Sequence, residues 1–268
     1  MPDTMPEPDA PRPAEPARDP DLCGDGARTP FAKAVGELVF PGMTDSRREL
    51  YLRIAATYDW TFGLHGRTAR AALWHSRRGQ HLRFVQLARL FEPDVVRRGR
   101  LWRRPRGAVT INDLGCGYGP LFEWLDRRRW LAPEARYIGY DLSERMIESA
   151  RRTVSDPRAA FYMAGEATEE ADYSFASGTF GMKLDVPDPD WELHCGDVLK
   201  GLWAQSRRGL AFNMLNIHGR HTRPDDGGLY YADPDHWAAF AERKLGAARV
   251  SLLARYSSHD FTVLAWRR

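Results

Sequence analysis

An aspartate and three glycines stand close together in the middle of the chain, in "DLGCGYG" at 113–119. Asp113 precedes Gly115, Gly117 and Gly119, and the next residues have the apolar spacing of a helix. Because glycine has no side chain, a bound molecule can approach the backbone closely there. A dinucleotide site needs the spacing GxGxxG, whereas this turn has GxGxG. The carboxylate is also unfavourable beside a pyrophosphate, and it suits a ligand that carries positive charge.

A second carboxylate, Asp141, ends the next predicted strand, "ARYIGYD". A carboxylate at this strand tip accepts hydrogen bonds from both hydroxyls of a ribose. A nucleoside with a cationic, amino-acid-like arm and no phosphate is S-adenosylmethionine. The third predicted strand leads to Glu166, which is placed to accept from the adenine amino group, and the fourth leads to Ser177 and Gly178, beside the sulfonium.

The elements that position these residues follow from the pattern after residue 107. Strand-like runs of β-branched and aromatic residues alternate with helix-like runs, the shortest of which is "EATEEA" at 166–171. This alternation predicts a doubly wound α/β fold, a mostly parallel sheet with helices on both faces. The closing runs "RVSLLARY" and "HDFTVLAWRR" are separated by too few residues for a crossover helix. The last strand is therefore expected to be antiparallel.

Composition divides the chain into three parts. Residues 1–40 are expected to be a disordered, proline-rich acidic tail, since the first thirty contain seven acidic residues and eight prolines. Residues 41–106 are expected to form a helical cap over the cofactor, because apolar residues recur there at helical spacing. Residues 107–268 are expected to be the Rossmann-like domain. The candidate lining residues of the cap are Tyr58, His65, Trp74, Gln80 and Arg83, for which helix packing (Trp74) and solvated surface (Arg83) are the alternatives.

Over residues 107–268 the sequence resembles the class I S-adenosylmethionine-dependent methyltransferases. "DLGCGYG", "YIGYDLS" and "FYMAGEA" are similar to the first three motifs of that family, and the paired closing strands resemble its reversed last strand. More narrowly, "ASGTFGMKLDVPD", "FNMLN" and "LYYADP" resemble a bacterial subgroup of unknown substrate. The resemblance implies S-adenosylmethionine as the cofactor, held by Asp113, Gly115, Cys116, Gly117, Asp141, Leu142, Met146, Glu166, Ala167, Ser177 and Gly178.

Composition also limits the compartment and the partners. The three cysteines are scattered, so neither a disulfide framework nor a zinc site is predicted, and Cys116 is interpreted as a small buried side chain. No long apolar run is present, and we expect a cytoplasmic protein with no membrane partner and no metal. The net charge is only +3, and just four of the 39 basic residues are lysine. This arginine bias is weak support for a nucleic-acid partner.

The acceptor site is expected at the tips of the fourth and fifth strands. In-line methyl transfer needs the acceptor atom about 3 Å from the methyl group, and a hydroxyl acceptor also needs a general base. His218 is the first candidate for the base, with an exposed loop histidine as the alternative, and Lys183 and Tyr231 are candidates for substrate binding. We predict transfer to O or N of a small molecule: a metabolite, sugar or specialised product. An RNA or protein methyltransferase and a non-catalytic S-adenosylmethionine-binding protein remain alternatives.

Overall fold

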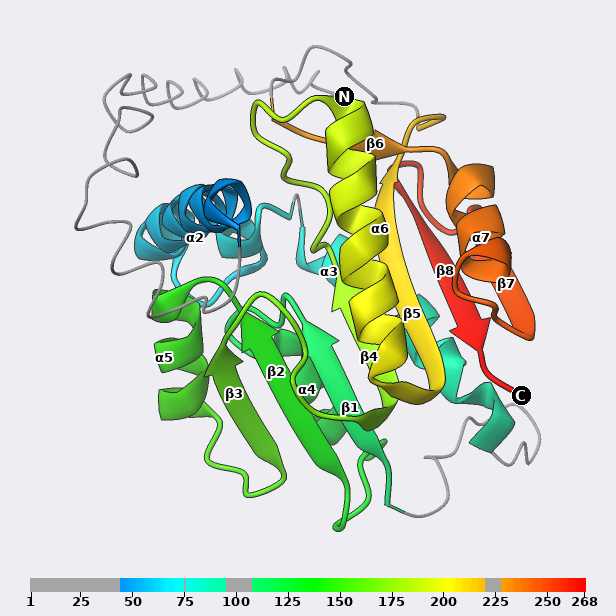
Figure 1. Cartoon of the computed structure of the whole chain (residues 1–268). Helices are drawn as coiled ribbons and strands as arrows, with labels where there is room; N and C mark the ends of the chain where they lie inside the picture. Colours follow the sequence, from blue (N-terminus) through cyan, green and yellow to red (C-terminus); the bar gives the residue numbers. More distant parts are fainter. Residues whose placement is uncertain (1–43, 75, 95–107, 220–227) are drawn as a thin grey trace, which may run out of the picture.

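An eight-stranded sheet forms the centre of the computed structural model, which describes residues 44–74, 76–94, 108–219 and 228–268 (Figure 1). The strand order is β3-β2-β1-β4-β5-β8-β7, and the short β6 pairs with β5. The strands are β1 (Thr110–Leu114), β2 (Arg136–Asp141), β3 (Ala159–Met163), β4 (Ala171–Ser177), β5 (Ser206–Asn216), β6 (Tyr231–Ala232), β7 (Arg249–Leu253) and β8 (Asp260–Trp266). Strands β1 to β6 pair in parallel, whereas β8 is antiparallel to both β5 and β7. The predicted sheet and its reversed last strand are confirmed, and β6 was not predicted.

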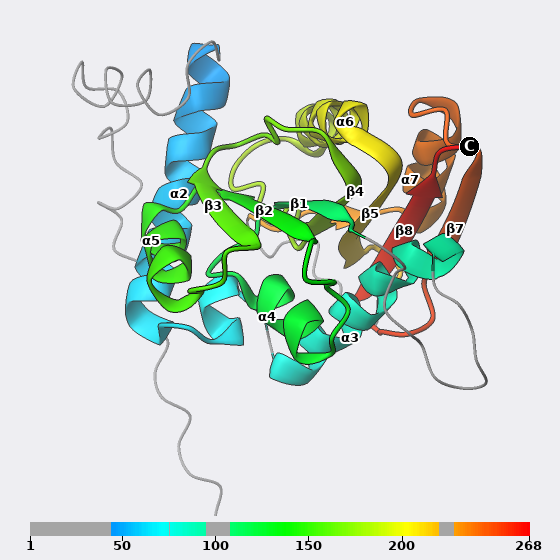
Figure 2. The same cartoon turned by 90° about the horizontal axis from the view of Figure 1, so that it is seen from below.

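Helices cover both faces of the sheet (Figure 2). On one face lie α6 (Asp188–Ala204) and α7 (Pro234–Arg243), and on the other lie α3 (Arg77–Leu87), α4 (Pro120–Arg127) and α5 (Glu144–Thr153). Two separate apolar clusters correspond to these faces, with the sheet between them. The helices begin at recognisable residues: Pro120 opens α4, and the side chains of Ser143 and Asp233 cap α5 and α7. No helix of the described segments is long and apolar enough to cross a membrane.

The segment between β3 and β4 differs from its prediction. "EATEEA" was expected to be a short helix, but residues 164–170 form bends and Ala171 already belongs to β4. Side chains from neighbouring strands hold this segment in its extended course: Asn112 Nδ2 donates to the Glu169 carbonyl at 2.6 Å, and Arg136 pairs with the Glu169 carboxylate at 2.8 Å. A six-residue helix would have too few internal hydrogen bonds to compete with these contacts.

The N-terminal cap, described here as residues 44–94, is helical as predicted and comprises α2 (Asp45–His65), η3 (Ala69–Ala72), α3 and η4 (Ala88–Asp94). The helix α2 contacts α5 and lies beside the ends of the parallel strands (Figure 1). The predicted tail (1–40) and residues 41–43, 75 and 95–106 of the predicted cap lie outside the described residues.

Arg83 joins the N-terminal cap to strand β8. Its guanidinium pairs with Asp260 at the start of β8, with Nη2 2.5 Å from Oδ1, and both side chains are less than a tenth exposed. Ser257 Oγ donates to the other carboxylate oxygen at 3.0 Å. The guanidinium carbon also lies 3.7 Å from the centre of the Trp74 ring. The solvated alternative for Arg83 is therefore wrong, because the side chain is enclosed by an ion pair and an aromatic face.

Replacing Asp260 by alanine should lower the free energy of unfolding by about 3–5 kcal/mol, because the buried Arg83 charge would lose its partner. Urea denaturation followed by circular dichroism measures this change. The matched control is Glu169→Ala, which removes the exposed pair with Arg136 and should cost less than about 1 kcal/mol. Equal losses in the two variants would contradict the structural role of the Asp260 pair.

Candidate active site

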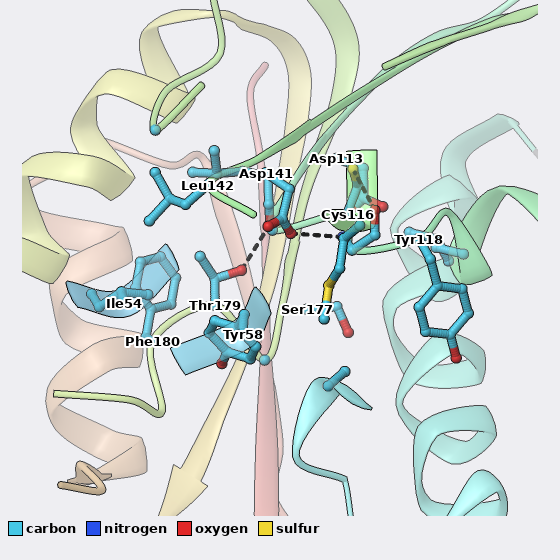
Figure 3. A pocket seen from close by; sticks show the side chains of 18 of the residues that line it. Ile54, Tyr58, Asp113, Cys116, Tyr118, Asp141, Leu142, Ser177, Thr179 and Phe180 are labelled. Atoms are coloured by element: carbon cyan, nitrogen blue, oxygen red, sulfur yellow. Dashed lines mark hydrogen bonds between the residues drawn. The ribbon is translucent and has the colours of Figure 1, made fainter. Parts of the chain in front are cut away.

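A cavity opens where β1, β2 and β4 end, and the residues predicted to hold the cofactor converge on it (Figure 3). We call it the first cavity. Ile54 and Tyr58 reach it from α2, opposite the ends of the strands. Its lining includes Asp113, Gly115, Cys116, Gly117, Asp141, Leu142, Met146, Ser177 and Gly178 from the predicted set. Two predicted residues do not line it: Glu166 is exposed, and Ala167 packs against the neighbouring apolar cluster. Their contacts with the cofactor stay predictions.

The three glycines of the turn all have left-handed backbone conformations, with φ of 76°, 54° and 85° at Gly115, Gly117 and Gly119. At Gly115 a side chain would in addition lie 2.6 Å from Thr179 Oγ1, so this position excludes any larger residue. The N–H groups of Gly115 and Cys116 both donate to the carbonyl of Tyr140, at 2.8 and 3.0 Å. These two N–H groups therefore bind the turn to the neighbouring strand.

The carboxylate of Asp141 also binds the glycine turn. Its Oδ2 accepts from the Gly117 N–H at 2.7 Å and its Oδ1 accepts from the Ser143 N–H at 2.9 Å. The carboxylate thus joins the end of β2 to both the glycine turn and the first residues of α5. Burial raises its pKa to about 6, although these two N–H groups act in the opposite direction. The side chain is positioned before any ligand arrives, as a binding residue requires.

Asp113 is more deeply buried than Asp141. One carboxylate oxygen accepts from the Tyr137 hydroxyl, and the other, Oδ1, has no hydrogen-bond partner among the residues that the structure describes. Burial raises the pKa of Asp113 to about 7; the hydrogen bond from Tyr137 opposes this shift and the charge of Asp141 adds to it. An unpartnered buried carboxylate oxygen is costly, and a positively charged or hydrogen-donating ligand would satisfy it.

The charges of the first cavity identify the kind of ligand that fits. Its described lining contains two aspartates and no arginine or lysine. A pyrophosphate would be repelled by these carboxylates, whereas a sulfonium and an ammonium would be attracted. S-adenosylmethionine carries both cations, and its ribose supplies hydroxyl donors for Asp141. The residues present therefore fit this cofactor, and the anchoring roles of Asp113 and Asp141 stay predictions.

A second cavity adjoins the first, and Tyr58, Ala72, Trp74 and Gly178 line both. The Trp74 ring lies directly on Gly178, where a Cβ would be 2.3 Å from Trp74 Cζ2. The rest of the lining mixes apolar and polar side chains: Leu73, Arg83, Met182, Asn213, Met214, Leu215, Asn216, Leu229, Tyr231, Ser258, His259 and Asp260, with Gly181 and Gly219. Arg83 and Asp260 neutralise one another, so this cavity has little net charge.

Of the three residues predicted for the acceptor site, one lines the second cavity and two do not. Tyr231 lines the second cavity. Lys183 does not, because its ammonium donates to the Val186 carbonyl at 3.1 Å and pairs with Asp188. His218 is exposed and lies outside both cavities, and its role as a base stays a prediction. Of the predicted cap residues, Tyr58, Trp74 and Gln80 line the first cavity, whereas His65 is exposed.

Sequence reasoning missed several residues at the site. Thr179 lines the first cavity, and its hydroxyl donates to the Leu114 carbonyl at 2.8 Å. Asn213 on β5 accepts from the Gly178 N–H at 2.8 Å and holds the end of β4. On α6, Trp191 and His194 also line the first cavity. Their spacing of three residues, which places both on one helix face, was the available signal.

The raised pKa values of Asp113 and Asp141 predict how stability changes with pH. Both aspartates ionise near pH 4 in the unfolded chain, so between about pH 4 and 7 the folded protein binds more protons. The free energy of unfolding should therefore fall as the pH rises through this range. Calorimetric scans at pH 5 and pH 8 should show a larger decrease in Tm for the ligand-free wild type than for Asp113→Asn, which removes one of the two groups. The same decrease in both proteins would contradict this assignment.

Comparison with known proteins identifies the family of the chain. Residues 111–201 match the family model described as "Methyltransferase domain". "Putative methyltransferase Rv1506c" of Mycobacterium tuberculosis (strain ATCC 25618 / H37Rv) is 39% identical over 156 residues, which are 58% of this chain and 91% of that protein. A SAM-dependent methyltransferase of Leishmania major is 14% identical and has a TM-score of 0.55, with 88% of this chain and 89% of that chain covered.

The structural likeness shows the fold, and the sequence identity, which extends over nearly the whole of the mycobacterial relative, shows the family. These findings agree with the glycine turn, the two aspartates and the reversed last strand. The chain belongs to the class I S-adenosylmethionine-dependent methyltransferases.

Proposed function

We propose that this enzyme methylates an oxygen or nitrogen atom of a small, uncharged molecule bound in the second cavity. The observation that carries the proposal is that the two cavities share one wall, formed by Tyr58, Ala72, Trp74 and Gly178. A methyl donor in the first cavity and an acceptor in the second would meet at this wall. The absence of net charge there disfavours phosphorylated or strongly ionised acceptors.

The bound cofactor supplies an electrophilic methyl group, and the protein supplies position and shielding. Asp113 and Asp141 would hold the amino-acid and ribose parts, while the cap covers the strand ends and excludes water from the reacting atoms. The buried pair of Arg83 and Asp260 would keep Trp74 in place at the boundary. Alignment by these residues is sufficient for a neutral amine acceptor.

A hydroxyl acceptor must also lose a proton. His259 lines the second cavity, and it is better placed for this step than the exposed His218. The enclosing cap also favours a small acceptor over RNA or protein, which would have to insert a nucleotide or side chain beneath it. The alternative of a binding protein without chemistry predicts no transfer to any acceptor.

The role of Asp141 in binding the methyl donor can be tested directly. Asp141→Ala should weaken binding of S-adenosylhomocysteine by about 10- to 150-fold, because hydrogen bonds to a charged group are worth about 1.5–3 kcal/mol. Isothermal titration calorimetry measures the Kd. Asp197→Ala, which alters an exposed carboxylate on α6, serves as the control and should bind as the wild type does. Unchanged affinity in a folded Asp141→Ala variant would refute the anchoring role.

The chemical class of the methyl acceptor and its place in the second cavity can be tested by labelling. With S-adenosylmethionine labelled in its methyl group, transfer is measured to a panel of phenols, glycosides and primary amines, and separately to total RNA and bulk protein. Label should enter the small-molecule fraction. Leu229→Trp, which fills the second cavity, should abolish transfer and leave S-adenosylhomocysteine affinity unchanged, while Ile217→Trp at an exposed position should affect neither. Label confined to RNA or protein, or full activity in Leu229→Trp, would overturn the proposal.

A further inference from the structure

The first cavity has a polar end and an apolar end. Asp113 and Asp141 form the polar end beside the glycine turn. Beyond Leu142, the cavity is lined by Ala164 and Gly165 after β3 and by several side chains from α2, α6 and the segment before α6: Tyr51, Ile54, Phe180, Trp191, His194 and Val198. If the ribose lies at Asp141, as proposed above, the purine must occupy this end, because the amino-acid arm occupies the other.

His194 is the polar ring on the α6 wall of this apolar end. It packs against Trp191, with ring centres 4.9 Å apart, and meets Tyr51 edge-on at 5.5 Å. Within the described part of the chain its ring nitrogens take part in no hydrogen bond, so their bonding capacity is left for a ligand. These contacts fix the plane of the imidazole while the nitrogens stay available.

The charge state of the His194 imidazole suits hydrogen bonding to an uncharged nucleobase such as adenine. Burial and, to a smaller extent, the positive charge of Arg47 lower its pKa to about 4, while Asp197 acts in the opposite direction. The ring is therefore neutral near pH 7, with one nitrogen donating and the other accepting. Neutral imidazole pairs with the amino group or a ring nitrogen of adenine, and it pays no desolvation cost for a charge.

Glu166, the residue expected to bind adenine, is less well placed. It is exposed and does not line the cavity. The preceding Gly165 is covered by the Tyr51 ring, since a Cβ there would be 2.2 Å from Tyr51 Cε2. A side chain at position 165 is therefore excluded by the Tyr51 ring.

We propose that His194 recognises the adenine of the cofactor by a hydrogen bond to its 6-amino edge. The ribose is attached to N9 of adenine, so the amino edge lies at the far side of the base from Asp141. The helix α6 covers the opposite face of the sheet from α4, which follows the glycine turn (Figure 2). His194 lines the cavity from α6 and Asp141 lines it from the end of β2, and the aromatic rings of Trp191 and Tyr51 hold the imidazole in place.

The experiment is a double-mutant cycle between protein and ligand that needs no methyl acceptor. Calorimetry compares S-adenosylhomocysteine with its 6-deamino analogue, in which purine replaces adenine. In the wild type, loss of the amino group should weaken binding by about 3- to 12-fold, the value of one neutral hydrogen bond. His194→Phe should bind the two ligands equally, whereas His194→Gln, which keeps an accepting group, should retain part of the discrimination.

Two control variants make the result specific. Leu193→Ala changes the exposed neighbour on α6, and Glu166→Gln changes the competing candidate; both should discriminate as the wild type does. Wild-type discrimination in a folded His194→Phe, or its loss in Glu166→Gln, would overturn the proposal. Failure of the wild type to bind S-adenosylhomocysteine would overturn the placement of the cofactor itself. Failure to find a small-molecule acceptor would leave the His194 result intact, so the two proposals fail separately.

Discussion

The carboxylate of Asp141 is the contact on which the geometry of the first cavity depends. By accepting from Gly117 and Ser143 at once, it joins the end of a strand, the glycine turn and the start of a helix. The Tyr140 carbonyl, one residue earlier, binds the same turn through two further N–H groups. Three N–H groups of the turn are thus hydrogen-bonded within the protein itself, which limits the conformations open to the turn and lowers the entropy cost of binding there.

The parts of this structure that could be predicted from sequence are those determined locally. Alternating strand and helix patterns predicted the sheet, and carboxyl ends of parallel strands must meet at one edge, so Asp113, Asp141 and Ser177 were correctly brought together. The reversed last strand followed from the short connection before it. The failed helix at 166–171 had the right local composition, but side chains from other strands determined its conformation.

The remaining features depend on contacts that no local pattern contains. Arg83 and Asp260 are 177 positions apart, and their pairing is visible only once α3 lies beside β8. The contacts of the loop side chains could not be predicted either. Lys183 and His218 follow strand tips as candidates should, yet Lys183 is held by Val186 and Asp188, and His218 is exposed and lines neither cavity. A strand tip predicts where a loop begins, and it does not predict where its side chains point.

The antiparallel course of β8 has a consequence for the order in which the two cavities are assembled. Because this strand runs against its neighbour, its first residue, Asp260, lies at the edge where the parallel strands end. Asp113 and Asp141 lie on strands that are synthesised much earlier. During translation a nascent chain still lacking β8 would therefore contain both aspartates of the first cavity, while Arg83 would lack Asp260. The buried ion pair beside Trp74 can thus form only after the last strand has been made and has paired with β5.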